Sequence, residues 1–192
     1  MIFNHIFELY DKLSYAIINM SMNFNLKSIT SKNLTKKQIN LICKLKDQIW
    51  KYGKKSQKEW FIKNIKRNDV HNLLYFGSKM IGYTLLRKRT YSNGQAKVSK
   101  YLLFDTLIIN QKYRAKKLSS LMMNFNNIVI KNSGYFSFLV CKKELINFYK
   151  KYNWKKLDNK KFVLKDHSYS SYGMIFNKKK INKKKYNFFF NI

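Results

Sequence analysis

The hydrophobic period of the chain changes twice between residues 101 and 141, and this change constrains the fold more than any other feature. Residues 101–109 (YLLFDTLII) are an apolar run of strand length. Residues 118–130 (LSSLMMNFNNIVI) repeat apolar positions at helical spacing, and residues 135–141 (YFSFLVC) are again a compact apolar run. The pattern predicts a strand, a helix and a second, buried strand in succession.

Further segments extend this unit in both directions. Ser56 and Glu59 have the S-x-x-E spacing of a capping box, which predicts a helix start at that point. Antiparallel neighbours around a strand–helix–strand unit imply an α/β chain with a mixed sheet that helices cover on both faces. The other expected strands are 24–29, 73–76, 80–87, 161–164 and 172–176, and the other expected helices are 35–52, 57–65 and 144–152.

The two ends of the chain differ from its centre. Residues 2–17 place apolar side chains at helical spacing, which predicts a short amphipathic helix. Met20 and Met22 stand directly before the first expected strand, so the true start could be either of them instead of Met1. We expect an N-terminal helical extension over residues 1–22, one domain over residues 23–177, and a basic, aromatic-ended tail over residues 178–192.

Positive charge dominates the composition, with a formal net charge of +31 at pH 7. The chain has 36 lysines, 4 arginines and no proline. Lysine and asparagine have A/T-rich codons, so nucleotide bias in the genome explains this mixture, and a real anionic partner is the alternative. Proteins that read nucleic-acid sequence favour arginine, whose planar fork makes bidentate contacts to guanine. We expect weak binding to polyanions that is lost in salt.

Several classes of protein do not fit the sequence. No run approaches the roughly 20 apolar residues of a membrane-spanning helix. The first twenty residues lack the basic and then apolar blocks of a secretory signal. Cys43 and Cys141 are too few for a disulfide framework, and no His/Cys spacing suggests a metal site. We expect two buried, reduced thiols in a cytoplasmic protein.

Residues 107–123 (LIINQKYRAKKLSSLMM) resemble the coenzyme-binding signature of the Gcn5-related N-acetyltransferases, the GNAT superfamily. In that signature a strand runs into R/Q-x-x-G-x-G/A and then into a helix. Arg114 takes the first position, and Lys117 and Ser119 take the two glycine positions. Downstream, residues 148–154 (FYKKYNW) resemble the family's F-Y-x-x-x-G-F motif. The resemblance implies the GNAT fold, a mostly antiparallel sheet that is splayed between strands 4 and 5.

The first motif has a physical logic of anion binding. A loop that turns into a helix aims unpaired backbone N–H groups at one point, where the helix dipole favours negative charge. The resemblance places the acetyl-CoA pyrophosphate there. Glycine is usual because the backbone approaches phosphate closely or takes a positive φ, so Lys117 is the main departure. The residues that the resemblance assigns to the coenzyme are Leu107, Ile108, Ile109, Arg114, Ala115, Lys116, Lys117, Leu118, Ser119 and Ser120, with Lys142 at a position where many members carry asparagine.

Two residues are candidates for proton transfer. Tyr149 matches the family's tyrosine that donates a proton to the leaving thiolate, and a phenol stays protonated near neutral pH. Its alternative role is that of a core tyrosine. Asp105 is the sole carboxylate on the strand before the signature and is the candidate base or amine anchor, or else an aspartate bonded to nearby backbone. His71 is a weaker candidate that we expect at the surface.

The first helices and the rims of the strands usually select the acceptor in this family. Trp60, Tyr83 and Arg87 lie in that region and are the candidate acceptor residues, although Trp60 is also expected to pack in the core. The run from Arg87 to Arg89 holds half of the arginines, which suggests either an anionic acceptor or a solvated charge run.

The leading expectation is an N-acetyltransferase that moves an acetyl group from acetyl-CoA to the primary amine of a small molecule or a protein. One alternative is a member that keeps the fold and serves as a binding module, motivated by Lys117 and Lys142. Another is a basic, nucleic-acid-associated protein, and a tail that touches anionic lipid through Phe188–Phe190 was also considered. No metal is expected, and a homodimer stays open.

Overall fold

The computed structural model describes residues 23–93, 98–165, 172–180 and 185–190. The expected helix over residues 2–17, the candidate starts Met1, Met20 and Met22, and part of the turn expected at Ser92–Gln95 lie outside the described residues. The strands are β1 (Phe24–Thr30), β2 (Val70–Phe76), β3 (Lys79–Ser92), β4 (Ser99–Ile109), β5 (Ser137–Cys141), β6 (Lys155–Leu157), β7 (Phe162–Leu164), β8 (Tyr172–Phe176) and β9 (Tyr186–Phe188). The helices are α2 (Lys36–Asp47), α3 (Lys54–Asn64), α4 (Leu118–Asn132) and α5 (Ile146–Lys150), and short 3-10 turns are η1 (Ser31–Asn33), η2 (Gln111–Tyr113), η3 (Lys143–Leu145) and η4 (Asn159–Lys161).

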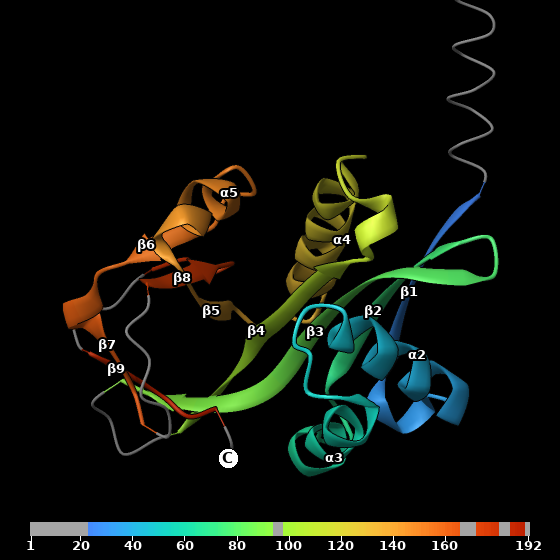
Figure 1. The fold of residues 1–192 in the computed structure, drawn as a ribbon. Helices are drawn as coiled ribbons and strands as arrows, with labels where there is room; N and C mark the ends of the chain where they lie inside the picture. The colour runs from blue at the N-terminus through green and yellow to red at the C-terminus, as the bar shows by residue number, and fades with distance from the viewer. Residues whose placement is uncertain (1–22, 94–97, 166–171, 181–184, 191–192) are drawn as a thin grey trace, which may run out of the picture.

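One sheet runs through the molecule in the order β1-β2-β3-β4-β5-β8-β6, and β9 joins β3 to β7 at the side (Figure 1). Neighbouring strands on the main path are antiparallel except β4 and β5, which are parallel and are joined through α4. The mixed, mostly antiparallel sheet predicted from the sequence is therefore confirmed. Its parallel pair is the strand–helix–strand unit of residues 101–141.

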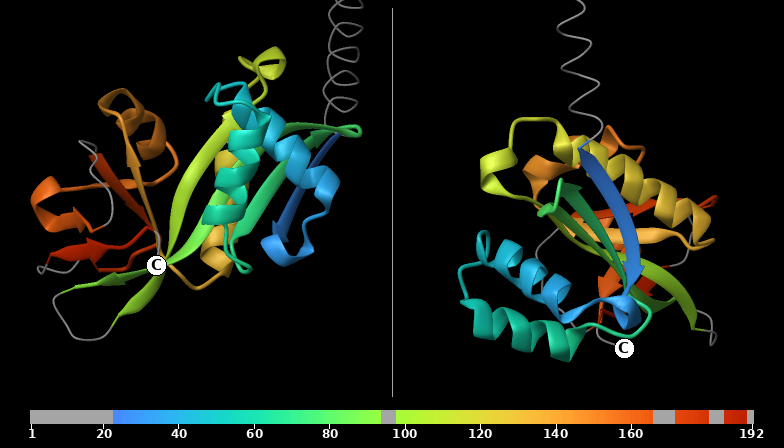
Figure 2. Two further views of the ribbon diagram at one scale, coloured as in Figure 1. Left: turned by 60° about the horizontal axis from the view of Figure 1, so that its bottom comes forward. Right: turned by 90° about the vertical axis from the view of Figure 1, so that its right-hand side faces the viewer.

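Helices cover both faces of this sheet. Helices α2 and α3 lie on one face and α4 lies on the other, as the two views of Figure 2 show. On the α2–α3 face, Ile42 and Phe61 pack against Leu73 and Leu85 of the sheet. On the opposite face, Met123 of α4 belongs to the same buried cluster as the residues of α5. Burial of apolar side chains on both faces explains why the central strands read as continuous hydrophobic runs.

The last described residues belong to the folded domain. Strand β9 pairs with Tyr91 and Ser92 of β3 and runs parallel to β7. Phe188 is fully buried and stacks on Phe138 with ring centroids 3.8 Å apart. Phe190 is also buried, so these aromatic side chains are not the exposed lipid-contacting plug considered from the sequence. Tyr186, Phe188 and Phe190 follow a lysine-rich segment in the sequence, but their rings are buried in the core.

The start of α3 and the place of the capping box differ from the sequence-based prediction. Helix α3 begins at Lys54 after Gly53, which has φ 82°, so Ser56 lies inside the helix and cannot form the predicted capping box. A capping box is present at α2 instead, where Thr35 accepts from the Gln38 amide and the Gln38 side chain accepts from the Thr35 amide. The S/T-x-x-E/Q spacing is met at both places, but only Thr35 directly precedes a helix.

Two further findings concern the described part of the chain. Cys43 and Cys141 are buried and free, as the sequence predicted. Among the described residues, no helix has the length and apolar character required to cross a bilayer.

Candidate functional site

Strands β4 and β5 separate soon after they meet. They pair only at Leu102–Ser137 and Leu103–Phe138. Beyond these positions β4 continues beside β3 to Ile109, and β5 continues beside β8 to Cys141. The facing edges of the two strands therefore lack a strand partner among the described residues, and their backbone N–H and C=O groups can pair with an extended ligand. In Figure 1, α4 and α5 stand on the two sides of this divergence.

A β-bulge lies where the strands begin to separate. Leu86 of β3 pairs with Phe104, whereas Leu85 pairs with Thr106, so Asp105 is an extra residue in β4 without a partner in β3. Bulges bend a strand and redirect its side chains. Phe104 and Asp105 point to opposite faces of the sheet at this position, and each face carries its own set of candidate groups.

Tyr149 lies on the α4–α5 face of the divergence. Its ring meets the Phe104 ring edge-on, with centroids 6.2 Å apart. It shares a buried cluster with Leu139 and Cys141 of β5, so it contacts both separating strands. Burial raises the pKa of the Tyr149 phenol, with a smaller contribution from Cys141. Its hydroxyl makes no hydrogen bond to any residue in the described part of the chain, so it can donate to a ligand.

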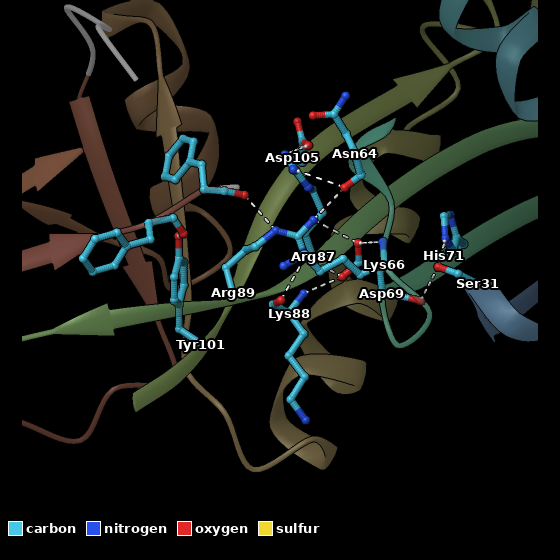
Figure 3. Close-up of polar contacts among 12 residues, drawn as sticks. Ser31, Asn64, Lys66, Asp69, His71, Arg87, Lys88, Arg89, Tyr101 and Asp105 are labelled. Atoms are coloured by element: carbon cyan, nitrogen blue, oxygen red, sulfur yellow. Dashed lines mark hydrogen bonds and ion pairs between the residues drawn. The ribbon is translucent and has the colours of Figure 1, made fainter. Parts of the chain in front are cut away.

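Asp105 lies on the α2–α3 face. Its carboxylate accepts a hydrogen bond from Arg87 Nη1 at 3.0 Å, and Arg87 Nη2 donates to the Asn64 carbonyl at 3.3 Å (Figure 3). The Arg87 guanidinium carbon lies 5.7 Å from the Trp60 ring centroid. The Asp105 side chain keeps 25% of its surface exposed against 6% for Arg87. The carboxylate is thus held firmly and still reaches solvent.

Lys46 of α2 adds a second cation to this face. Its ammonium nitrogen lies 3.4 Å from the centroid of the Trp60 ring and 5.9 Å from that of Trp50. Lys46 is only 5% exposed. Burial lowers the pKa of Lys46 to about 8, although the nearby Asp105 carboxylate acts in the opposite direction.

The loop between β4 and α4 has the backbone conformation that glycine usually supplies. Ala115 and Lys117 have positive φ angles of 65° and 53°. Lys117 is the residue before the first turn of α4, and it has no side-chain capping hydrogen bond. The backbone N–H groups of Leu118 and Ser119 have no acceptor among the described residues, and they point out of the positive end of the helix. Lys117 is exposed, and its side chain does not cap the helix.

Helices α4 and α5 are connected next to this loop. The Tyr152 hydroxyl donates to Ser120 Oγ at 2.6 Å, and the Asn127 amide donates to the Tyr152 carbonyl at 2.9 Å. The Trp154 indole N–H donates to Asn127 Oδ1 at 3.0 Å. These contacts fix the position of the Tyr149 helix relative to the start of α4.

No family model matches the sequence, and no curated protein sequence matches it. Solved structures do match. Escherichia coli ElaA superposes with a TM-score of 0.59 at 13% identity and covers 79% of this chain and 98% of its own. An acyl-CoA N-acyltransferase from Pseudomonas aeruginosa has a TM-score of 0.59 at 11% identity, with the same coverage of 79% and 98%. An acetyltransferase from Streptococcus agalactiae has a TM-score of 0.57 at 10% identity and covers 80% of this chain and 97% of its own.

The chain has the GNAT fold. The superposed residues span nearly the whole length of these solved structures, 98% for ElaA and for the P. aeruginosa acyltransferase. The GNAT fold expected from the resemblance of residues 107–123 is therefore confirmed. At identities of 10–13% the likeness extends to the fold alone.

The GNAT frame brings most of the sequence-predicted residues to the β4–β5 divergence. Tyr149 and Asp105 approach it from opposite faces, and Leu107, Ile108 and Ile109 form the end of β4. Trp60 and Arg87 lie beside Asp105. Lys142 is exposed directly after β5. The turn and first helical residues after β4 are Arg114, Ala115, Lys116, Lys117, Leu118, Ser119 and Ser120, and Arg114 Nε donates to the Ile109 carbonyl at 3.4 Å.

Tyr83 does not belong with the candidate acceptor residues, contrary to the prediction from the sequence. Its side chain is 0% exposed, and its hydroxyl lies 2.9 Å from Nδ1 of His71, so it faces no acceptor. His71 is likewise fully buried, not at the surface as expected, and its Nε2 lies 2.9 Å from Ser31 Oγ. Burial lowers the pKa of His71 to about 4, and this neutral ring supports the sheet beneath α2 and α3.

The Arg87-Lys88-Arg89 run is not a solvated charge run. Arg89 is 1% exposed and forms a buried ion pair with Asp69 at 2.8 Å, while its Nε donates to the Phe190 carbonyl (Figure 3). Arg87 and Arg89 share the Asn64 carbonyl as an acceptor. The two arginines therefore have separate tasks, because Arg87 reaches the site and Arg89 ties the C-terminal residues to the core.

Lys46 is the functional candidate that sequence reasoning missed. Helix α2 carries Lys36, Lys37, Lys44 and Lys46 within twelve residues, so no local signal separates Lys46 from its neighbours.

A separate open depression of about 340 Å³ lies between β1, β2 and α2, far along the sheet from Asp105, and none of the site residues lines it. In the part of the chain that the structure describes, no group of His, Cys, Asp and Glu side chains is arranged to hold a metal ion.

Proposed function

We propose that the protein is an N-acyltransferase that transfers the acetyl group of acetyl-CoA to a primary amine. The observation that carries the proposal is the combination of an unpaired β4–β5 edge with a positive-φ loop that opens α4. The edges suit the amide-bearing pantetheine arm, which can add as a further strand. The free N–H groups at Leu118 and Ser119 suit the pyrophosphate.

The residues present fit such a co-substrate. Lys117 takes the left-handed conformation despite its side chain, so loss of glycine has not changed the course of the backbone. Arg114, Lys116 and Lys117 add positive charge at the same helix end, which favours a phosphate group further. When bound, the thioester supplies an activated acyl group.

The chain's own residues would then perform two proton transfers. Asp105 accepts the proton of the acceptor ammonium, directly or through water, and the neutral nitrogen attacks the thioester carbonyl carbon. The C–N bond forms as the C–S bond breaks, and Tyr149 donates its proton to the sulfur. The second proton that the nitrogen loses as the amide forms passes through water and restores the Tyr149 phenol. The raised pKa of Tyr149 keeps it protonated for this role. Much of the rate enhancement comes from holding nitrogen and carbonyl in attack geometry.

The test combines binding and turnover. Acetyl-CoA should raise the melting temperature in a saturable manner, because a ligand specific for the native state stabilises it. Thiol release with a panel of amines should exceed the rate without amine. Absence of both effects would sink the proposal. Coenzyme binding without thiol release across the panel would instead support a binding module that retains the fold.

A further inference from the structure

The α2–α3 side of the site carries a cation that the described protein does not neutralise. Lys46 is 5% exposed, and its ammonium makes no hydrogen bond or ion pair with any described residue. Its near neighbours are the indole rings of Trp60 and Trp50. Burying an ammonium without a carboxylate partner is costly, even when aromatic faces contribute. The position therefore indicates an anion that arrives with a ligand.

The other charges at this site are already matched. Arg87 uses Nη1 for Asp105 and Nη2 for the Asn64 carbonyl. Its Nε is fully buried without a hydrogen-bond partner, so it cannot reach a ligand. Of Arg87 and Lys46, the two cations described on this face of the site, Lys46 is the one left to meet an incoming group. One ammonium beside two indole rings suits a monoanionic carboxylate, whereas phosphate groups are usually bound by several donors or arginine clusters.

The location of Lys46 places this anion near Asp105, the candidate base for the reacting amine. Trp60 contacts both Lys46 and Arg87, and Arg87 holds Asp105, so one indole ring connects the unmatched cation to the candidate base. A small molecule that carries both an ammonium and a carboxylate can place the first at Asp105 and the second at Lys46. Trp60 provides an apolar floor between them.

We propose that Lys46 binds the carboxylate of the acceptor, and that the acceptor is a free amino acid whose amine reacts beside Asp105. The proposal rests on the acyltransferase function proposed above and names its substrate class. The products would be an N-acetylamino acid and the free thiol of coenzyme A. No group beyond these two substrates is required, because the first ammonium proton passes to Asp105, and the second replaces through water the proton that Tyr149 gives to the thiolate.

The test compares the common amino acids with their carboxamides as acceptors of acetyl groups from acetyl-CoA, at one near-neutral pH. Amidation removes the negative charge beside the amine and so lowers the amine pKa, which supplies more neutral nucleophile. A preference for the acid therefore cannot come from amine reactivity. We expect at least one acid to exceed its amide about 10-fold or more in kcat/KM, the loss expected when a buried charge loses its hydrogen-bond partner.

Variants assign that preference to Lys46. Lys46→Met keeps an unbranched side chain of nearly the same length without its charge, and should bring the ratio of acid to amide close to one. Lys44→Met, at an exposed position of the same helix, should leave the ratio unchanged. As a measurement independent of turnover, N-acetylamino acids should raise the melting temperature of the wild type more than their carboxamides do, and Lys46→Met should lose that difference.

Three results would overturn the proposal. The first is equal use of acids and amides, which leaves acyl transfer established and removes only the carboxylate site. The second is a preference that persists in Lys46→Met. The third is acetylation of Lys46 itself, detected by peptide mass spectrometry, because an acetylated lysine carries no charge. If the wild-type protein binds no acetyl-CoA, the proposed acyltransferase function itself fails. That outcome is distinct from the loss of the carboxylate site alone.

Discussion

Phe104 and Asp105 are consecutive residues on β4, yet Phe104 contacts Tyr149 on the α4–α5 face while Asp105 pairs with Arg87 on the α2–α3 face. The bulge at Asp105 lies where β4 leaves β5. A thioester held between these strands would therefore meet the amine from one face and release its sulfur toward the other. The separation of proton acceptor and proton donor by one strand follows from the alternation of side chains along it.

Replacement of Tyr149 by phenylalanine should lower kcat about 100-fold, the lower end of the contribution of a general acid. The ring remains against Phe104, so folding and coenzyme binding should change little. Thiol-release kinetics and calorimetric titration with coenzyme A measure the two effects. Tyr135→Phe is the matched control, because Tyr135 lies before β5 at its paired end. An unchanged kcat would exclude Tyr149 as the proton donor.

Replacement of Lys117 by valine should weaken acetyl-CoA binding roughly 10-fold, because a β-branched residue strains the left-handed conformation by about 1–3 kcal/mol. Lys117→Gly, which loses the same charge, should bind more tightly than the valine variant, since glycine takes positive φ without strain. Lys116→Val is the control, at a neighbouring position whose φ is not positive. Equal affinities of the valine and glycine variants would contradict a role of this loop conformation in binding.

Replacement of Arg89 by methionine should lower the free energy of unfolding by about 3–5 kcal/mol, because Asp69 is left buried without its partner. The double variant Asp69→Asn with Arg89→Met should lose less than the sum of the two single variants. Urea denaturation measures all three. Additive losses would mean that Arg89 acts mainly through its bond to the Phe190 carbonyl.

Lys46→Met should be more stable than the wild type near neutral pH, and the advantage should shrink as the pH rises. The pKa of Lys46 is lowered to about 8 in the folded protein from 10.5. Below pH 8, Lys46 is protonated in the folded and the unfolded state, and the folded state carries the full cost of burying the charge. The pKa shift from 10.5 to about 8 corresponds to a cost of about 3 kcal/mol, because one pKa unit is worth about 1.4 kcal/mol. Between pH 8 and 10.5 the unfolded state binds more protons, so wild-type stability rises relative to the variant. Denaturation curves of both proteins across this range measure the difference, and a pH-independent difference would contradict the burial of the charge.

Local patterns located most of the elements and the loop between β4 and α4. The helical period of residues 118–130 matches α4, and residues 172–176 match β8. Asn153, in the turn that follows α5, has a φ of 64°, as expected of a residue that tolerates the left-handed region. Strands β6, β7 and β9 have three residues each, too few to display a period, and of these only β7 was predicted, within residues 161–164.

The sequence by itself determined the strand–helix–strand unit, the turn at Lys117 and the GNAT resemblance, because periodicity and backbone preference act between residues close in the chain. The tertiary structure alone decided which charges meet. It buried Arg89 against Asp69, left Arg87 to hold Asp105, and selected Lys46 from the lysines of α2 to face Trp60. Such pairings depend on desolvation and on contacts between distant segments, which no local pattern records.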